Sequence, residues 1–99
     1  MNSTKEPIYY YGDYSTAVYA YLKADDVTAE EQISMLEQII ADAANKSKNV
    51  APGLHAHLGM LYFETGNPSL GTTHFETEKS LFPESVHYID FLLKSAKGA

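Results

Sequence analysis

The chain has 99 residues, of which 44% are hydrophobic and 20% charged, a composition typical of one globular domain and not of a disordered chain. Thirteen acidic residues against seven lysines give a net charge of -6, which disfavours binding to nucleic acid and to anionic lipid surfaces. Cysteine is absent, which excludes disulfides, thiolate nucleophiles and sulfur-bound zinc.

The first seven residues are polar and end in Pro7, which predicts a flexible tether over 1–7 ahead of a single domain over 8–99. No apolar run approaches the ~20 residues of a membrane-spanning helix, and the tether lacks the hydrophobic segment of a signal peptide. We therefore expect the chain as given to be soluble. A Met followed by a polar tether is equally typical of an artificial start that replaces an export signal.

Residues 8–22 contain six of the eight tyrosines. Apolar residues recur at helical spacing from Tyr14 to Tyr21, which predicts a short amphipathic helix over 14–23 with Asp13 as its N-cap.

The T-x-x-E pattern of a capping box predicts the start of a second helix, with Thr28 as N-cap and Glu31 three residues later. Apolar residues then follow on one face, and the helix is expected to run to about Lys46 and to be terminated by Asn49.

The positions of proline and glycine in the rest of the sequence predict three more helices. Pro52 suits the first turn of a third helix, which stops at residues 66–68, where Asn67 caps a fourth helix with Pro68 at its first position. The fourth helix ends before Pro83, and a fifth runs from about 84 to 95 with Gly98 just past its end. The sequence thus predicts an all-α fold of about five helices in antiparallel hairpins, without strands.

Residues 52–85 resemble one tetratricopeptide repeat, a unit of two antiparallel helices with a period of about 34 residues. His55 and Glu78 depart from the pattern, which favours Trp and Ala at these positions. Glycine inside a helix costs about 1 kcal/mol relative to Ala, so Gly59 and Gly71 are expected where the two helices cross closely. The residues that match the pattern are Leu58, Gly59, Tyr62, Gly66, Asn67, Gly71, Phe75 and Pro83.

A wider resemblance is carried by three segments, YYYGDY (9–14), APGLHAHLG (51–59) and FETEKSLFPES (75–85). Through these segments the chain resembles a family of small bacterial envelope lipoproteins of unknown function, often encoded beside a lipoprotein like the curli secretion channel. The resemblance implies a precursor with a lipoprotein signal and an acylated cysteine, located on the periplasmic side of the outer membrane. Residues 1–7 then stand where the tether to the lipid anchor would be.

The four histidines are the candidate metal ligands. His55 and His57 are two residues apart, so on a helix their imidazoles point roughly 200° apart and cannot share one ion. His74 and Glu78 are four residues apart and supply two ligands on one side, but a site needs further ligands from elsewhere. We therefore expect packed or solvated histidines, with no metal and no cofactor.

Catalytic motifs are missing from the sequence, which has no G-x-S-x-G nucleophile elbow and no phosphate-binding glycine loop. Glu30 and Glu31 belong to the capping box, and Glu76 and Glu78 are expected on a solvated helix face. The sequence predicts a protein that is not an enzyme.

Candidate contact residues lie in two places. Consecutive tyrosine rings before the first helix cannot all be buried, and they form either a cap on the helix stack or an interface. On the third helix, three residues correspond to the concave, peptide-binding side of tetratricopeptide hairpins, although Phe63 suits the core equally well. The candidate partner-binding residues are Tyr9, Tyr10, Tyr11, Tyr19, Met60, Phe63 and Glu64.

The resulting hypothesis is a protein-binding or assembly subunit of a bacterial envelope complex, whose partner is a protein such as an envelope lipoprotein. It contacts the membrane only through a lipid anchor that this chain lacks. The alternative is a cytoplasmic tetratricopeptide adaptor for a short peptide, and a metal-binding protein or an enzyme is the third. One clear repeat falls short of the roughly three that a stable solenoid needs, which makes homo-oligomerisation a further expectation.

Overall fold

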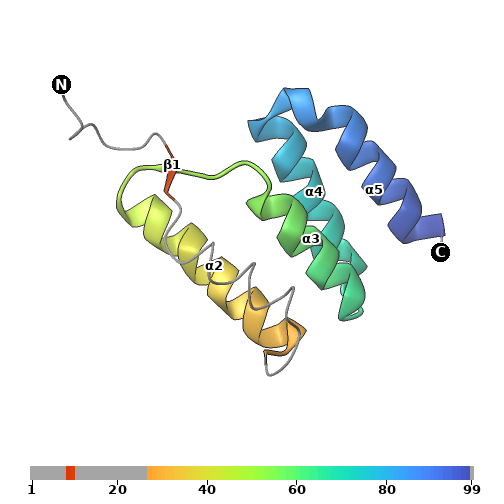
Figure 1. Ribbon diagram of the computed structural model, residues 1–99, viewed down its shortest axis with the longest axis horizontal. Helices are drawn as coiled ribbons and strands as arrows, with labels where there is room; N and C mark the ends of the chain where they lie inside the picture. The colour runs from red at the N-terminus through yellow and green to blue at the C-terminus, as the bar shows by residue number, and fades with distance from the viewer. Residues whose placement is uncertain (1–8, 11–26, 99) are drawn as a thin grey trace.

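The computed structural model describes residues 9–10 and 27–98. The described chain contains four α-helices, which confirms the all-α class, and the helix expected over 14–23 lies outside the described residues. Its elements are β1 (Tyr9–Tyr10), α2 (Ala29–Asn45), β2 (Asn49–Val50), α3 (Leu54–Glu64), α4 (Pro68–Leu81), the 3-10 turn η1 (Pro83–Ser85) and α5 (Val86–Gly98). Figure 1 shows α3 and α4 side by side, with α2 on one side of the pair and α5 on the other.

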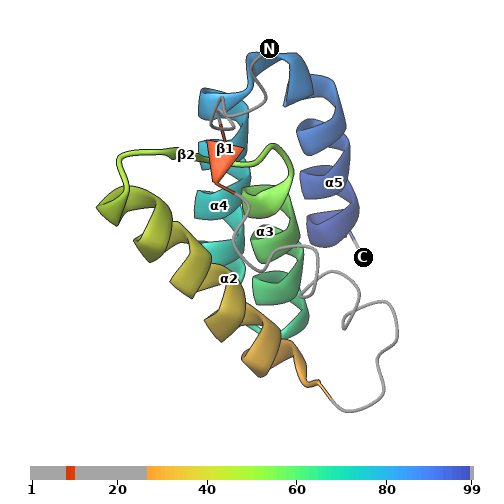
Figure 2. The same ribbon diagram turned by 60° about the vertical axis from the view of Figure 1, so that its left-hand side comes forward.

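Two short strands were not expected from the sequence. β1 and β2 pair in parallel, with Tyr9 opposite Asn49 and Tyr10 opposite Val50. Strands of two residues are too short to show the alternation by which a strand is recognised in a sequence. The pairing nevertheless ties the backbone of Tyr9 and Tyr10 to the linker between α2 and α3 (Figure 2).

The capping box at the start of α2 is confirmed. The Glu31 backbone N–H donates to Thr28 Oγ1 over 3.1 Å, and the Thr28 N–H donates to Glu31 Oε1 over 2.9 Å. The helix ends at Asn45 with Lys46 as its C-cap, and the backbone then turns through Ser47, whose φ is 56°. Asn49 was therefore misjudged as the terminator, since it already belongs to β2.

The start of α3 also differs from the prediction. The helix begins at Leu54, and Pro52 lies in the turn before it, because Gly53 occupies the N-cap with a φ of 97° that interrupts the helix. Asn67 and Pro68 take the expected N-cap and first positions of α4, although the Asn67 side chain makes no capping hydrogen bond. α5 continues through Gly98, so that glycine lies in its last turn rather than beyond it.

The close crossing of α3 and α4 at Gly59 and Gly71 is confirmed. A Cβ atom on Gly59 would lie 2.6 Å from the Phe75 ring and 3.0 Å from the carbonyl oxygen of Gly71. A Cβ atom on Gly71 would lie 2.6 Å from the Phe63 ring and 2.9 Å from the carbonyl oxygen of Gly59. Each glycine therefore leaves room for the backbone of the other helix and for one phenylalanine ring.

Two apolar clusters lie on either side of α3. Of the large apolar side chains on α4, Phe75 is buried, whereas Leu70 and Leu81 are exposed. Among the described residues, no helix is both long and apolar enough to span a membrane. The cluster between α2 and α3 comprises Leu36, Ile39, Ala43, Val50, Leu54, Leu58 and Leu61. The cluster that joins α3, α4 and α5 comprises Ala56, Phe75 and Ile89, with Met60, Phe63, Leu92 and Leu93 packed against it.

Candidate functional site

The tyrosines proposed as contact residues fall largely outside what the structure describes. Tyr9 and Tyr10 are placed by their backbone in β1, opposite Asn49 and Val50. Tyr11 and Tyr19, and the side chains of all four tyrosines, lie outside the described part of the chain. Their role in binding stays a prediction.

The three candidate residues on α3 take different positions. Met60 is half-buried and packs against the cluster that joins α3, α4 and α5. Phe63 stacks on Phe75 with ring centroids 5.7 Å apart and lies over Gly71. Glu64, at the end of α3, is exposed. Met60 and Phe63 therefore serve helix packing, and of these three side chains only Glu64 is largely open to solvent.

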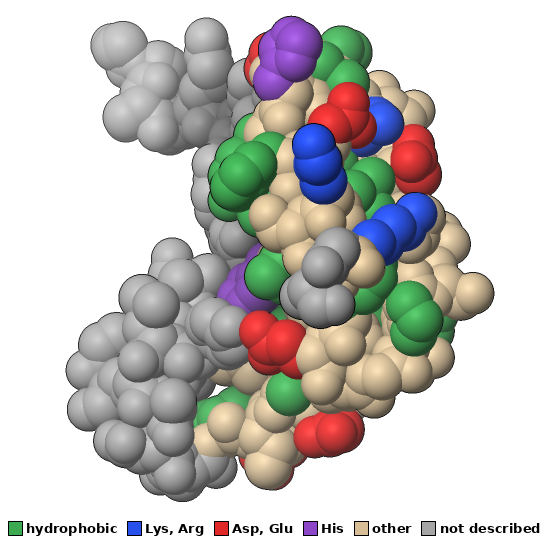
Figure 3. All heavy atoms as spheres, turned by 90° about the vertical axis from the view of Figure 1, so that its right-hand side faces the viewer, with side chains coloured by type: hydrophobic (Ala, Val, Ile, Leu, Met, Phe, Trp, Pro, Cys, Tyr) green, Lys and Arg blue, Asp and Glu red, His purple; other side chains and the backbone are tan. Residues whose placement is uncertain are grey.

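An exposed aromatic surface lies on α5. Tyr88 is 62% exposed and Phe91 is 63% exposed, and they are three residues apart on one side of the helix. Glu84 and Lys94, at the two ends of this side, are also exposed. We call these four residues the α5 stripe. Figure 3 looks onto the side of the molecule formed by α5, where hydrophobic side chains reach the surface among charged ones.

The sequence contained a signal for the α5 stripe. The apolar face of this helix consists of Ile89, which is buried, and of Leu92 and Leu93, which pack beside it. Tyr88 and Phe91 do not fit that face, so the helical spacing already left them on the outside. Two aromatic rings outside an apolar face that is already complete are the feature that could have been noticed.

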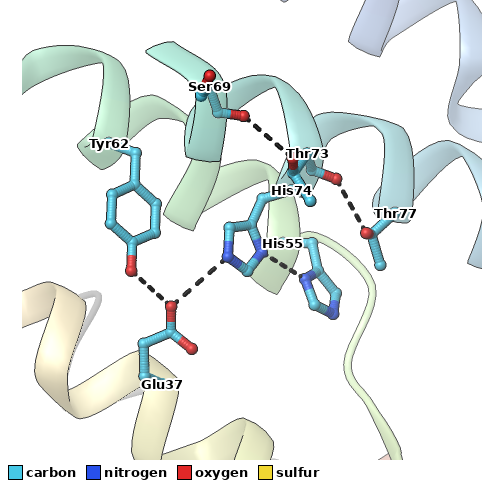
Figure 4. A network of polar contacts seen from close by, with 7 residues as sticks. All are labelled: Glu37, His55, Tyr62, Ser69, Thr73, His74 and Thr77. Atoms are coloured by element: carbon cyan, nitrogen blue, oxygen red, sulfur yellow. Dashed lines mark hydrogen bonds and ion pairs between the residues drawn. The ribbon is translucent and has the colours of Figure 1, made fainter. Parts of the chain in front are cut away.

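A chain of polar contacts connects α2 with the α3–α4 hairpin (Figure 4). The Tyr62 hydroxyl donates to Glu37 Oε2 over 2.6 Å, and His74 Nε2 lies 3.5 Å from the same oxygen. Nδ1 of His74 in turn lies 2.9 Å from Nδ1 of His55. The His74 ring stacks between the other two rings, 5.4 Å from Tyr62 and 5.1 Å from His55 by centroid. We call Glu37, His55, Tyr62 and His74 the polar network.

The protonation states of the polar network follow from its burial. Burial, reinforced by repulsion from His74, lowers the pKa of His55 to about 4, and burial lowers the pKa of His74 against the opposing effect of Glu37. Burial and the hydrogen bond to Glu37 raise the pKa of Tyr62 to about 12. At neutral pH both imidazoles are therefore uncharged. If His74 donates through Nε2 to Glu37, its Nδ1 accepts from His55.

The polar network joins three helices, α2, α3 and α4, through direct side-chain contacts. Both ring nitrogens of His74 are engaged, one by Glu37 and the other by His55. Among the described residues, no group of three or more potential ligand side chains is arranged to hold a metal ion. The hydroxyls of Thr73 and Thr77, drawn in the same view, donate to backbone carbonyl oxygens of α4, those of Ser69 and Thr73 (Figure 4).

Glu78 was expected to be solvated, and this expectation is wrong. Its side chain is 3% exposed and accepts hydrogen bonds from the backbone N–H groups of Gly53, over 2.8 Å, and Ala56, over 3.1 Å. The start of α3 has no side-chain cap of its own, so the carboxylate from α4 accepts from its amides instead. His74 and Glu78 consequently have different partners. The sequence signal for its burial was that Glu78 occupies a position where the tetratricopeptide pattern favours a small, inward-facing Ala.

Comparison with family models matches residues 8–92 to a domain of unknown function (DUF4810). The chain belongs to this family. The DUF4810 match includes the complete polar network and three residues of the α5 stripe, and stops two residues before Lys94. Searches of curated proteins and of solved structures found no match.

Proposed function

We propose that this DUF4810 protein is a non-enzymatic protein-binding or assembly subunit of a bacterial cell-envelope complex, and that its native form is lipid-anchored. The observation that carries the proposal is the pair of exposed aromatic rings on α5, Tyr88 and Phe91. Tyrosine and other large aromatic side chains are enriched in the energetic centres of protein interfaces. The envelope location rests on the resemblance of the three sequence segments described above.

A tetratricopeptide-like arrangement is part of this proposal. Ile89 and Leu92 lie one repeat period, about 34 residues, after His55 and Leu58. All four side chains pack against neighbouring helices. This spacing supports reading α5 as the first helix of a following repeat. α2 does not fit this repeat period. The residue one period before the buried Phe75 is Ala41, which is exposed.

The α5 stripe is favoured over the concave face of α3 as the contact surface. Met60 and Phe63, which the resemblance to a tetratricopeptide repeat assigns to that face, already pack within the helix bundle. Tyr88 and Phe91 keep most of their surface in solvent. An incoming protein would therefore remove more apolar surface from water on α5 than on α3.

Site-specific photo-cross-linking in the native host tests this proposal. The full-length native protein carries a photoreactive phenylalanine analogue at Tyr88 or Phe91, with Ser34 on the exposed side of α2 as the control position. We expect adducts from the two α5 positions and not from position 34, in cells whose membrane fraction contains the protein. Absence of any adduct from α5 would contradict the binding role. Recovery in the cytoplasm with a short peptide bound would favour the adaptor alternative.

A further inference from the structure

The α5 stripe carries its charges in a definite order. Glu84 lies at its N-terminal end, Tyr88 and Phe91 lie in the middle, and Lys94 lies at its C-terminal end. The spacings of four, three and three residues keep these side chains on one side of a helix. η1, which holds Glu84, leads into α5 without a break, because Val86 has helical angles of φ -57° and ψ -43°.

Asp90, the acidic residue within α5 itself, does not disturb this order. Asp90 Oδ1 lies 2.8 Å from Nζ of Lys79 on α4, so its charge is compensated within the chain. Lys79 is also 3.6 Å from Glu76 Oε1 on its own helix. The charges at the two ends of the α5 stripe are thus opposite in sign and separated by an aromatic centre, over a length of about 15 Å at 1.5 Å per residue.

A surface with this order is complementary to itself when reversed. In an antiparallel pairing about a two-fold axis, each contact occurs twice, because residue i of one copy meets residue j of the other and the reverse. Glu84 then approaches Lys94 of the second copy, and Tyr88 approaches Phe91 of the second copy. A parallel pairing would instead place like charges together at both ends.

We propose that the α5 stripe is a self-association surface, on which two copies of this chain pair their α5 helices antiparallel about a two-fold axis between Tyr88 and Phe91. The inference rests on the proposed assembly function and names the occupant of the same surface. The charge complementarity of the α5 stripe with its own reversed copy favours a second copy over an unrelated partner.

The size of the surface sets the strength of the dimer. An aromatic side chain buries about 150–250 Å² in full, so four partly exposed rings contribute several hundred Å². Stable complexes bury about 1,200 Å² or more in total, and smaller contacts form weak, transient pairs. The dimer is therefore expected to dissociate with a constant of about 100 μM.

Sedimentation equilibrium of the purified chain, from about 10 to 1,000 μM around that constant, tests the proposal. We expect a monomer–dimer equilibrium that the double variant Tyr88→Ser/Phe91→Ser weakens by about tenfold or more. Leu70→Ser is the matched control, because Leu70 is an exposed apolar side chain on α4 outside the α5 stripe. Circular dichroism of each variant confirms that its helices are retained.

Charge reversal tests the antiparallel geometry. Glu84→Lys and Lys94→Glu should each weaken the dimer by about fivefold, because each creates two like-charge contacts. The double variant Glu84→Lys/Lys94→Glu should regain the affinity of the wild type, because both ends are exchanged. Glu30→Lys on α2 makes the same charge change in another exposed first turn and should leave the dimer intact or slightly stronger, since it makes the chain less acidic.

The outcomes separate this inference from the proposed function. A chain that stays monomeric throughout, or a double charge reversal that is no better than the single ones, would overturn the self-association proposal. If position 88 or 91 then still cross-links to a different protein in cells, the assembly function stands and the surface belongs to that protein. A dimer that the α5 substitutions leave unchanged would likewise overturn the assignment of the surface.

Discussion

The two interfaces of α3 are held together in different ways. Towards α4, the backbones approach closely because Gly59 and Gly71 have no side chains, and Phe63 and Phe75 fill the space beside them. Towards α2, an apolar cluster is accompanied by the polar network, in which Glu37 connects α2 to two rings on the hairpin. The first interface depends mainly on volume, whereas the polar network, which reaches from Glu37 on α2 to the contact between His55 and His74 inside the hairpin, depends partly on protonation. Substitutions that add volume should therefore damage the hairpin most, and acid should act on the polar network.

The largest effect is expected for Gly71→Leu. Its Cβ alone would lie 2.6 Å from the Phe63 ring and 2.9 Å from the Gly59 carbonyl oxygen, so the helices must separate. We expect a loss of about 3 kcal/mol of unfolding free energy, which exceeds the gain of about 1 kcal/mol in helix propensity. Urea unfolding measures the change, with Ser80→Leu at an exposed position of α4 as the control. Stability at or above that of the wild type would contradict the close crossing.

The next largest effect is expected for Glu78→Ala. This change leaves the N–H groups of Gly53 and Ala56 without their acceptor at a buried helix start, and should cost about 2 kcal/mol. Glu78→Gln keeps one carbonyl oxygen and should cost less. Glu76→Ala on the same helix is the control, because Glu76 is exposed. Equal unfolding free energies for Glu78→Ala and Glu76→Ala would show that the carboxylate does not stabilise α3.

Local signals account for the parts of the fold that could be predicted. The start of α2 depends on Thr28 and Glu31, which are three residues apart, and the α3–α4 turn depends on Gly66-Asn67-Pro68. The start of α3 was misjudged because it depends on the conformation of Gly53 and on Glu78, a residue 25 positions away. The pairing of β1 with β2 joins residues that are even further apart in the sequence, Tyr9 with Asn49, and has no local signature.

The candidate sites likewise differ in whether a local sequence signal predicts them. Tyr88 and Phe91 could be recognised from helical spacing, since they fall outside the buried face of α5. The polar network could not, because it joins Glu37 on α2 to residues on α3 and α4, and the relative position of α2 is set by packing. Helical spacing relates His55 only to residues of its own helix, such as His57. It cannot predict the contact of His55 with His74 on the other helix of the hairpin.

Acid is expected to destabilise the fold through the polar network. The pKa of His55 is about 4 in the folded chain, against 6.5 for an unperturbed histidine, so between these values the unfolded chain binds a proton that the folded chain does not. The stability contributed by the neutral imidazole is complete above pH 6.5 and is lost as the pH falls towards 4. Protonating both rings would also turn the contact between His55 Nδ1 and His74 Nδ1 into two opposed donors.

The loss of stability in acid can be measured by comparing the wild type with a His55 variant. A shift of one pKa unit corresponds to about 1.4 kcal/mol, and after discounting for solvent screening we expect a loss of about 1 to 2 kcal/mol between pH 7 and pH 4.5. Because carboxylates also titrate towards pH 4, the informative quantity is the difference from His55→Gln, whose stability should fall less. His87→Gln on α5, at an exposed position, should follow the wild type. Identical pH profiles for wild type and His55→Gln would remove the polar network as the cause.

The smallest effect, and the most specific to the α2 interface, is expected for Tyr62→Phe. The substitution removes only the hydroxyl that donates to Glu37 over 2.6 Å, while the ring can keep its stacking on His74. A hydrogen bond to a charged, partly exposed acceptor contributes about 1 kcal/mol, so the unfolding free energy should fall by that amount or less. Tyr88→Phe makes the same chemical change on the exposed face of α5 and should be neutral. Since the contact joins α2 to the hairpin, its loss should also speed amide hydrogen exchange in α2 more than in α4. If Tyr62→Phe is as neutral as Tyr88→Phe and exchange in α2 is unchanged, then the apolar cluster around Leu36 and Leu58 holds α2 without help from the polar network.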